Sequence, residues 1–187
     1  YYQFAAGVTG SNIVERATQV LDFDKVRVFE MSGTARINLL PLFTPAHPNY
    51  ELSSQVTVSD HLTDRINDDY EPSTFSGQVN NGTTGYAVKY SGMSQTVNLE
   101  WVTNFSMKVK EHRLRLMGGF SYAYGVSESM SMNNTNFTTD ATTVNNMGEG
   151  TLAAEDGKVN MSSAKSDNTL IAFFARANYD WKERYLL

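Results

Sequence analysis

Apolar and polar residues alternate with a period of two along several long stretches of this chain. The clearest stretch runs from Thr96 to Val109, where the odd positions are almost all apolar and the even positions mostly polar. The odd positions are Val97, Leu99, Trp101, Thr103, Phe105, Met107 and Val109. Successive side chains of a β-strand point to opposite faces, whereas a helix would scatter them around its circumference. The pattern therefore predicts a strand over 96–109.

Further segments alternate in the same way and predict additional strands. They lie at 27–40, 50–58, 114–126 and 168–181. A short polar turn at 110–113 separates 96–109 from 114–126, so these two strands are expected to form a β-hairpin. The sequence thus predicts an all-β fold of antiparallel, up-and-down strands.

The connections between these strands are of two kinds, which alternate along the chain. Short turns are expected at 40–49, 110–113 and 182–184, and long polar loops at 59–94 and 127–166. Compact domains rarely hold two loops of this length, since connections have a median of ~4–6 residues. Short turns on one side and long loops on the other are typical of outer-membrane β-barrels. The long loops would then be extracellular.

Strand length favours the same interpretation. A strand of 14 residues (96–109), tilted by ~40°, spans roughly 35 Å, which exceeds the ~25 Å apolar band of such barrels. Aromatic residues also gather near the short-turn ends, at Tyr50, Tyr179, Trp181 and Tyr185. A soluble β-sandwich that binds carbohydrate, or a smaller outer-membrane barrel acting as an adhesin or structural protein, are the alternatives. Five strands cannot close a barrel, so we expect a piece of a longer polypeptide.

Composition narrows the possible functions. The net charge is −5 and no Lys/Arg cluster is present, so a nucleic-acid partner is not expected. The chain has no cysteine, which excludes disulfides and zinc-thiolate sites. Its longest apolar run, Leu170 to Ala175, is far shorter than the ~20 residues of a membrane helix. No nucleophile elbow or phosphate-binding glycine loop occurs, so neither enzyme activity nor a cofactor is expected.

Aromatic residues in the polar loops are the candidates for contact with a ligand or a partner protein. They are Tyr70, Phe75, Tyr86, Tyr90 and Phe137. Such rings can stack on sugars, but they can also pack together and order a loop. On the strands, the polar positions would face the lumen. These positions are Glu100, Asn104, Arg115, Arg176, Asn178 and Asp180.

Three carboxylates in the first long loop are candidate Ca²⁺ ligands. Asp60, Asp64 and Asp68 recur at intervals of four, and on a short helix they would share one face. The EF-hand spacing and its glycine are missing, so a solvated acidic loop is the alternative and no metal site is expected.

Four segments, in order along the chain, resemble SusC/RagA-type TonB-dependent outer-membrane transporters of Bacteroidetes. Residues 175–187, ARANYDWKERYLL, resemble a strand-turn-strand of that family, and 111–120, EHRLRLMGGF, resemble one of its strands. Residues 136–140, NFTTD, and 70–73, YEPS, are similar to loop elements of the family. The similarity extends from about residue 29 to the end.

The resemblance implies a barrel of ~22 strands with a plugged lumen, of which this sequence would supply five or six. Such transporters lie in the outer membrane, in contact with its lipid, and import glycan or peptide fragments. They act beneath a SusD-like surface lipoprotein and are energised through the TonB complex. The plug and the TonB-binding motif (TonB box) are expected to lie outside this sequence.

Overall fold

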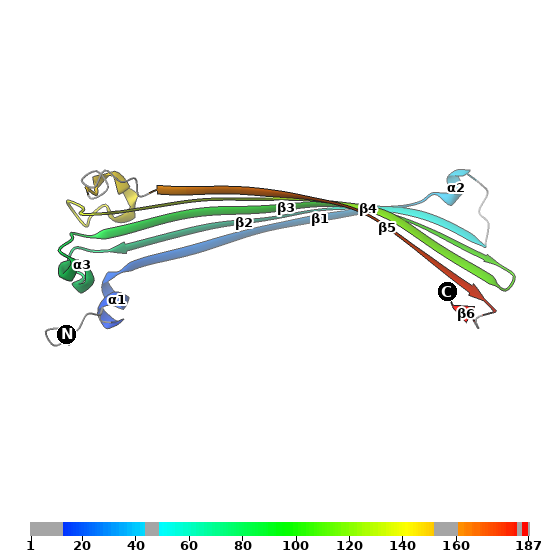
Figure 1. The fold of residues 1–187 in the computed structure, drawn as a ribbon, viewed down its shortest axis with the longest axis horizontal. Coiled ribbons are helices and arrows are strands. Elements are labelled where there is room, and N and C mark those ends of the chain that lie inside the picture. The colour runs from blue at the N-terminus through cyan, green and yellow to red at the C-terminus, as the bar shows by residue number, and fades with distance from the viewer. Residues whose placement is uncertain (1–12, 44–48, 152–160, 183–184, 187) are drawn as a thin grey trace. The chain divides into compact units, whose positions relative to one another are not determined.

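The computed structural model describes residues 13–43, 49–151, 161–182 and 185–186, and its strands form one six-stranded sheet in the order of the sequence (Figure 1). The strands are β1 (Leu21–Asn38), β2 (Tyr50–Glu71), β3 (Tyr86–Val109), β4 (His112–Thr135), β5 (Met161–Trp181) and β6 (Tyr185–Leu186). The short helices are α1 (Ile13–Gln19), α2 (Leu40–Phe43) and α3 (Ser76–Asn81), with 3₁₀ turns η1 (Thr143–Asn145) and η2 (Met147–Glu149). No helix in the described residues is both long and apolar enough to cross a membrane.

The sheet is open, and its five long strands run antiparallel in an up-and-down order. This arrangement confirms the all-β fold predicted from the alternating pattern. At the end of β5, Asp180 pairs with Leu186 and Trp181 pairs with Tyr185 of β6. A β-sandwich requires two packed sheets, whereas the described strands belong to one.

The strands extend well beyond their predicted ends. β2 continues to Glu71 and β3 begins at Tyr86, so the connection covers 72–85 rather than 59–94. Likewise β4 continues to Thr135, and the connection to β5 covers 136–160 rather than 127–166. These extensions carry many charged and polar residues, so the alternating pattern weakens even though strand pairing continues.

Polar side chains on neighbouring strands bond to each other in these extensions. Asp64 of β2 lies 3.2 Å from the guanidinium of Arg27 on β1, and Asp68 lies 3.3 Å from the ammonium of Lys89 on β3. Opposite charges on neighbouring strands stabilise a sheet as apolar pairs do. The missed strand ends are therefore sections in which cross-strand charge replaces apolar packing.

The hairpin between β3 and β4 is tighter than the predicted turn at 110–113. Its loop consists of Lys110 and Glu111, and Lys110 has a left-handed backbone (φ 54°). Two-residue hairpin loops need positive φ values because only these match the twist of the strands. His112 and Arg113 consequently belong to β4.

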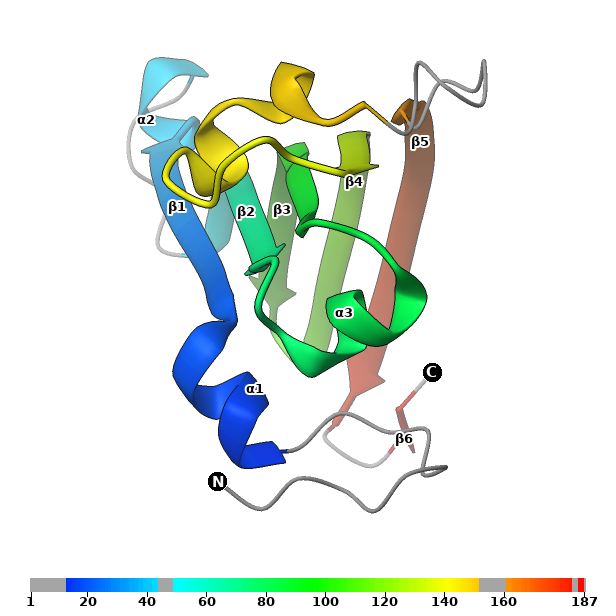
Figure 2. The same cartoon turned by 90° about the vertical axis from the view of Figure 1, so that its left-hand side faces the viewer.

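The chain divides into two compact units, each of which includes parts of the long strands. Unit 1 comprises residues 1–27, 63–94 and 127–166, and unit 2 comprises 28–62, 95–126 and 167–187. The buried hydrophobic residues found in the described part of the chain all lie in unit 1: Tyr70, Phe75, Ala87 and Phe137. Helices α1 and α3 also belong to unit 1 (Figure 2).

Candidate functional site

One face of the sheet in unit 2 is made of large hydrophobic side chains that remain exposed. We call it the apolar face. Its members are Phe29, Met31 and Ile37 (β1), Val56 and Val58 (β2), Trp101 (β3), Leu116 (β4), and Ile171, Phe173, Tyr179 and Trp181 (β5). Phe173 is 80% exposed, and its ring contacts Phe120 of β4 at a centroid distance of 5.3 Å. A continuous exposed surface of this kind marks contact with lipid or another protein.

Polar atoms on the apolar face bond to one another. The indole nitrogen of Trp101 donates a hydrogen bond to Ser54 Oγ at 2.6 Å, and Ser54 Oγ lies 3.3 Å from Thr103 Oγ1. An unpaired polar group in an apolar environment is costly, whereas a paired group is tolerated. The internal pairing therefore suits this face to an apolar solvent.

The opposite face of unit 2 is polar, and we call it the polar face. Arg36 lies 3.5 Å from Glu51 and donates to Ser53 Oγ at 3.3 Å. Arg115 bonds at 3.1 Å to Asp180, a residue only 6% exposed. A cavity of about 280 Å³ runs along this face, and its lining includes Asn104, Arg115, Arg176 and Asn178. Four of the residues predicted for the lumen thus line one cavity.

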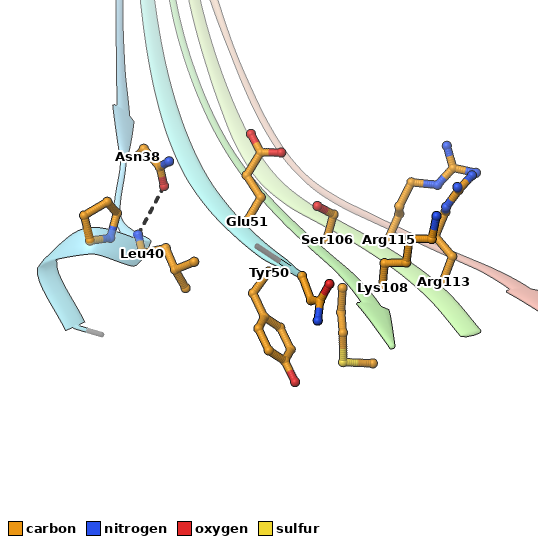
Figure 3. A pocket seen from close by; sticks show the side chains of 11 residues that line it. Asn38, Leu40, Tyr50, Glu51, Ser106, Lys108, Arg113 and Arg115 are labelled. Atoms are coloured by element: carbon orange, nitrogen blue, oxygen red, sulfur yellow. Dashed lines mark hydrogen bonds between the residues drawn. The ribbon is translucent and has the colours of Figure 1, made fainter. Parts of the chain in front are cut away.

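A larger cavity of about 610 Å³ lies at the end of the strands nearest the short connections (Figure 3). Glu51 and Ser106 line it, together with the cationic side chains of Lys108, Arg113 and Arg115. At its edge, Asn38 Oδ1 accepts a hydrogen bond from the Leu40 amide at 3.2 Å, where β1 ends and α2 begins. The cavity can hold a polar group with negative charge.

Three of the five candidate aromatic residues are buried in unit 1. Tyr70, Phe75 and Phe137 are 1%, 2% and 3% exposed. Tyr70 and Phe137 pack edge to face at a centroid distance of 5.7 Å, against Ala87 and the partly buried Val144 and Met147. In this arrangement none of the three presents a ring to solvent, and all three order the connections.

The other two candidates, Tyr86 and Tyr90, lie on β3 rather than in a loop. Both are half-buried. The Tyr90 side chain lies against Gly92, and a Cβ at Gly92 would be only 2.5 Å from the Tyr90 hydroxyl oxygen. Contact of these two residues with a ligand or partner stays a prediction.

A carboxylate that sequence analysis missed, Asp140, joins the two connections of unit 1. Its Oδ1 accepts hydrogen bonds from the Tyr70 hydroxyl at 2.7 Å and the Ser73 amide at 2.9 Å, and its Oδ2 accepts one from the Ser73 hydroxyl at 2.7 Å. Burial acts to raise the pKa of Asp140, but the hydrogen bonds from Ser73 and Tyr70 prevail and hold that pKa below its ordinary value. Asp140 therefore stays ionised and fastens residues 136–140 to residues 70–73.

Two further contacts complete this assembly, which we call the loop cluster (70–85 and 134–151). Gly85 has a left-handed backbone (φ 79°), and a Cβ there would lie 2.9 Å from the Tyr70 hydroxyl oxygen. The Phe137 amide donates to the Thr84 carbonyl at 2.7 Å. The resemblance to the transporter family could have revealed this cluster. The two loop elements that carry it, 70–73 and 136–140, are the segments that contact each other.

Helix α1 is attached to the loop cluster by polar contacts. Glu15 accepts hydrogen bonds from the amide and hydroxyl of Ser76, at 2.7 and 2.6 Å, where α3 begins. Arg16 lies 2.8 Å from Glu71 and 3.4 Å from Asp69. Glu15 thus provides an acceptor for the amide of Ser76, the first residue of α3, and this amide has no hydrogen-bond partner within the helix.

The candidate Ca²⁺ ligands Asp60, Asp64 and Asp68, expected in the first long loop, lie on β2. Residues four apart on a strand are separated by about 13 Å, which is too far for one ion. Asp60 accepts hydrogen bonds from Gln95 at 3.0 and 3.1 Å, while Asp64 and Asp68 pair with Arg27 and Lys89. In the described part of the chain, no three His, Cys, Asp or Glu side chains are grouped to hold a metal ion.

Comparison with known proteins gives a result for structure alone. No family model and no curated protein matches the sequence. Among solved structures, the RagAB peptide importer in the closed-closed state matches with a TM-score of 0.74 and 16% identity, over 98% of this chain. The RagAB peptide transporter (TM-score 0.68) and the importer in the open-open state (0.67) match over 96%, each at 14% identity.

The fold is that of a segment of the RagA barrel. The chain covers 19%, 19% and 18% of the three matched chains, so it spans about a fifth of their length. The predicted fold, antiparallel up-and-down strands like those of part of a large barrel, is confirmed. We therefore call the chain the barrel segment.

Proposed function

We propose that the barrel segment forms part of the wall of a TonB-dependent outer-membrane transporter that imports nutrient oligomers. The apolar face is the observation that carries this proposal. Burial of one large apolar side chain is worth about 1.5–3 kcal/mol, so a face of many such side chains in water would be strongly unfavourable. Lipid provides the apolar surroundings that this face needs.

The two faces and the two kinds of connection give the segment an orientation. We assign the apolar face to lipid and the polar face, with Arg36, Arg115 and Arg176, to the lumen. Transmembrane barrels have short periplasmic turns and longer extracellular loops. The loop at Lys110 and Glu111 is accordingly periplasmic, and the loop cluster is extracellular.

The cargo and the partners belong to the same proposal. The matched structures are named as peptide importers, which supports a peptide fragment as cargo, with a glycan fragment as the alternative. A SusD-like lipoprotein would cover the extracellular side, and TonB would act through a plug encoded elsewhere in the polypeptide. Tyr86 and Tyr90 are the proposed contacts for cargo or lid, while Tyr70, Phe75 and Phe137 hold the loop cluster in shape.

The test is uptake by the native polypeptide in its own cells. Cells that lack the gene should lose growth on short peptides or oligosaccharides as the sole source of nitrogen or carbon, and the intact gene should restore it only where TonB is present. Growth that does not depend on the gene would overturn the transport role. An outer-membrane location with no effect on uptake would favour the adhesin or structural barrel.

A further inference from the structure

Arginines from different strands meet in the cavity of about 280 Å³ on the polar face of unit 2. They are Arg36 of β1, Arg115 of β4 and Arg176 of β5, and we call the cavity the arginine cavity. Among the described residues that line it, Glu51 is the only carboxylate. Positive charge therefore exceeds negative charge here, in a chain whose net charge is −5.

The neighbouring carboxylates do not balance all of this positive charge. Glu51 lies 3.5 Å from Arg36, and both of these side chains are more than half exposed. Arg115 bonds at 3.1 Å to Asp180, which does not line the cavity. Arg176 is exposed and forms no ion pair with any residue that the structure describes. Exposed ion pairs are weak, so Arg36 can exchange Glu51 for another carboxylate, and Arg176 is free to bind one.

Uncharged polar groups complete the lining and suit it to the same ligand. Asn104 of β3 and Asn178 of β5 bring side-chain amides, which can donate hydrogen bonds to an oxygen anion. Ser53 Oγ accepts a hydrogen bond from Arg36 at 3.3 Å, which helps to fix that guanidinium on the wall. A guanidinium is planar and binds a carboxylate through two parallel hydrogen bonds. The donors of the arginine cavity therefore match a carboxylate.

The cationic lining continues from the arginine cavity toward the short connections. The cavity of about 610 Å³ shares Glu51, Ser106 and Arg115 with it and adds Lys108 (Figure 3). Arginines and lysines that line a pore select anions, and passage requires sites weak enough to release them. Exposed arginines with exchangeable partners meet both requirements. In the orientation proposed above, this lining leads toward the periplasmic side.

We propose that the arginine cavity binds a carboxylate of the imported peptide as the peptide passes along the wall, so that acidic peptides are preferred as cargo. The inference rests on the proposed function, because it requires the polar face to line a lumen and a peptide to be the cargo. A peptide carries a carboxylate at its C-terminus and one on each Asp or Glu side chain. Arg176 binds the carboxylate, Arg36 joins it in exchange for Glu51, and the amides of Asn104 and Asn178 donate to its oxygens.

The test measures initial rates of uptake by cells that carry the complete native polypeptide. The probes are labelled short peptides of alternating Ala and Glu, and peptides of the same length in which Gln or Lys replaces Glu. Arg176→Gln is compared with Arg27→Gln, a matched substitution on β1 that does not line the cavity. The preference for the Glu peptide over the Gln peptide should fall roughly two- to fivefold in Arg176→Gln and about tenfold in Arg36→Gln/Arg176→Gln.

Charge reversal makes the test sharper. Arg176→Glu should shift the preference toward the Lys peptide, whereas Arg176→Lys, which keeps the charge, should retain the preference for the Glu peptide. A merely structural role of Arg176 would not move the preference in opposite directions. Heat-dependent mobility in electrophoresis checks that each variant forms a barrel, and the Gln and Lys variants decide the question if Arg176→Glu does not fold.

An unchanged preference in Arg36→Gln/Arg176→Gln would overturn the proposal. An equal loss of uptake for the Glu and Gln peptides would also overturn it, because the arginines would then bind a carboxylate of the polypeptide itself rather than of the cargo. Peptide uptake that does not depend on the gene would contradict the proposed function, an outcome distinct from gene-dependent uptake without a preference for acidic peptides.

Discussion

Two adjacent glycines of β4, Gly118 and Gly119, differ in how much space a side chain would have, because they lie on opposite faces of the sheet. A Cβ at Gly119 would collide with the ring of Phe174 and lie 3.0 Å from the Trp101 carbonyl oxygen, while a Cβ at Gly118 would meet nothing within 4 Å. We therefore expect Gly119→Ala to destabilise the barrel by about 1–3 kcal/mol, because the ring must move. Gly118→Ala should leave the free energy of unfolding nearly unchanged. Urea unfolding of the native polypeptide in detergent measures both, and equal effects would contradict the described packing.

The assignment of faces predicts a second pair of substitutions. Phe173→Asp places a charge on the apolar face, and we expect it to cost about 1–3 kcal/mol, since carboxylates on the lipid face are penalised less than Arg or Lys. Asn178→Asp adds the same charge on the polar face and should be mild. The measurement is the yield of folded barrel in detergent. If both variants fold with the same yield, the apolar face does not contact lipid.

For single residues, the sequence predicts which face of the sheet a side chain occupies but not which side chains it contacts. Alternation alone assigns Trp101 to one face and Asn104 to the other, because side chains of a strand must alternate. The contact of Phe174 with Gly119 depends on the register between β4 and β5, and no local pattern specifies that register. The hydrogen bonds of Asp140 likewise join residues 67 and 70 positions apart.

The loop cluster is the element whose stability depends on one carboxylate. Asp140→Asn keeps one acceptor oxygen but loses the charge and the acceptor of the Ser73 hydroxyl, so we expect a loss of about 1–3 kcal/mol of local stability. Hydrogen exchange at the amides of 72–85 should accelerate, with no change in β3. Thr138→Ala, at an exposed position in the same connection, is the control. Unchanged exchange in Asp140→Asn would show that the connections are held by other contacts.

The same carboxylate gives the loop cluster a defined pH dependence. The pKa of Asp140 is lowered in the folded protein, so its contribution is complete above the ordinary aspartate value of ~3.9 and is lost as the pH falls through the lower folded value. Exchange in 72–85 should therefore show no effect of Asp140 protonation between about pH 5 and 7 and accelerate only below about pH 4. Acceleration near pH 6 would point to a different group.

The strands show which features of an element can be predicted. Their apolar sections follow from the sequence, whereas their polar extensions do not. Residues 63–71 of β2 carry Arg65, Asp68 and Asp69, and such a composition is typical of a solvated loop. Arg65 bonds to Asp24 of β1 at 3.0 and 2.7 Å, and the strand continues because its neighbours provide these partners. Predicting these extensions therefore requires comparing the charges of two neighbouring segments, because the pattern within one segment does not reveal them.

At the scale of the whole molecule, the proposed transporter wall requires further strands beside the open sheet. One face of unit 2 exposes large apolar side chains, and the barrel segment spans about a fifth of the chains that share its fold. Alternation was sufficient to predict an all-β fold of long antiparallel strands, because successive side chains of a strand point to opposite faces. The identity of a cargo could not be predicted, because the alternating pattern of a strand specifies the face that a side chain occupies and not the molecule that it contacts.

The most direct test of the central claim is the intact mass of the native polypeptide in fractionated membranes of the source organism. A transporter wall of this kind predicts a product several times heavier than 20.8 kDa, found in the outer-membrane fraction. A soluble product of about 20.8 kDa would contradict the assignment to a transporter wall, because the apolar face would then lie in water and the sheet would have no further strands to close it.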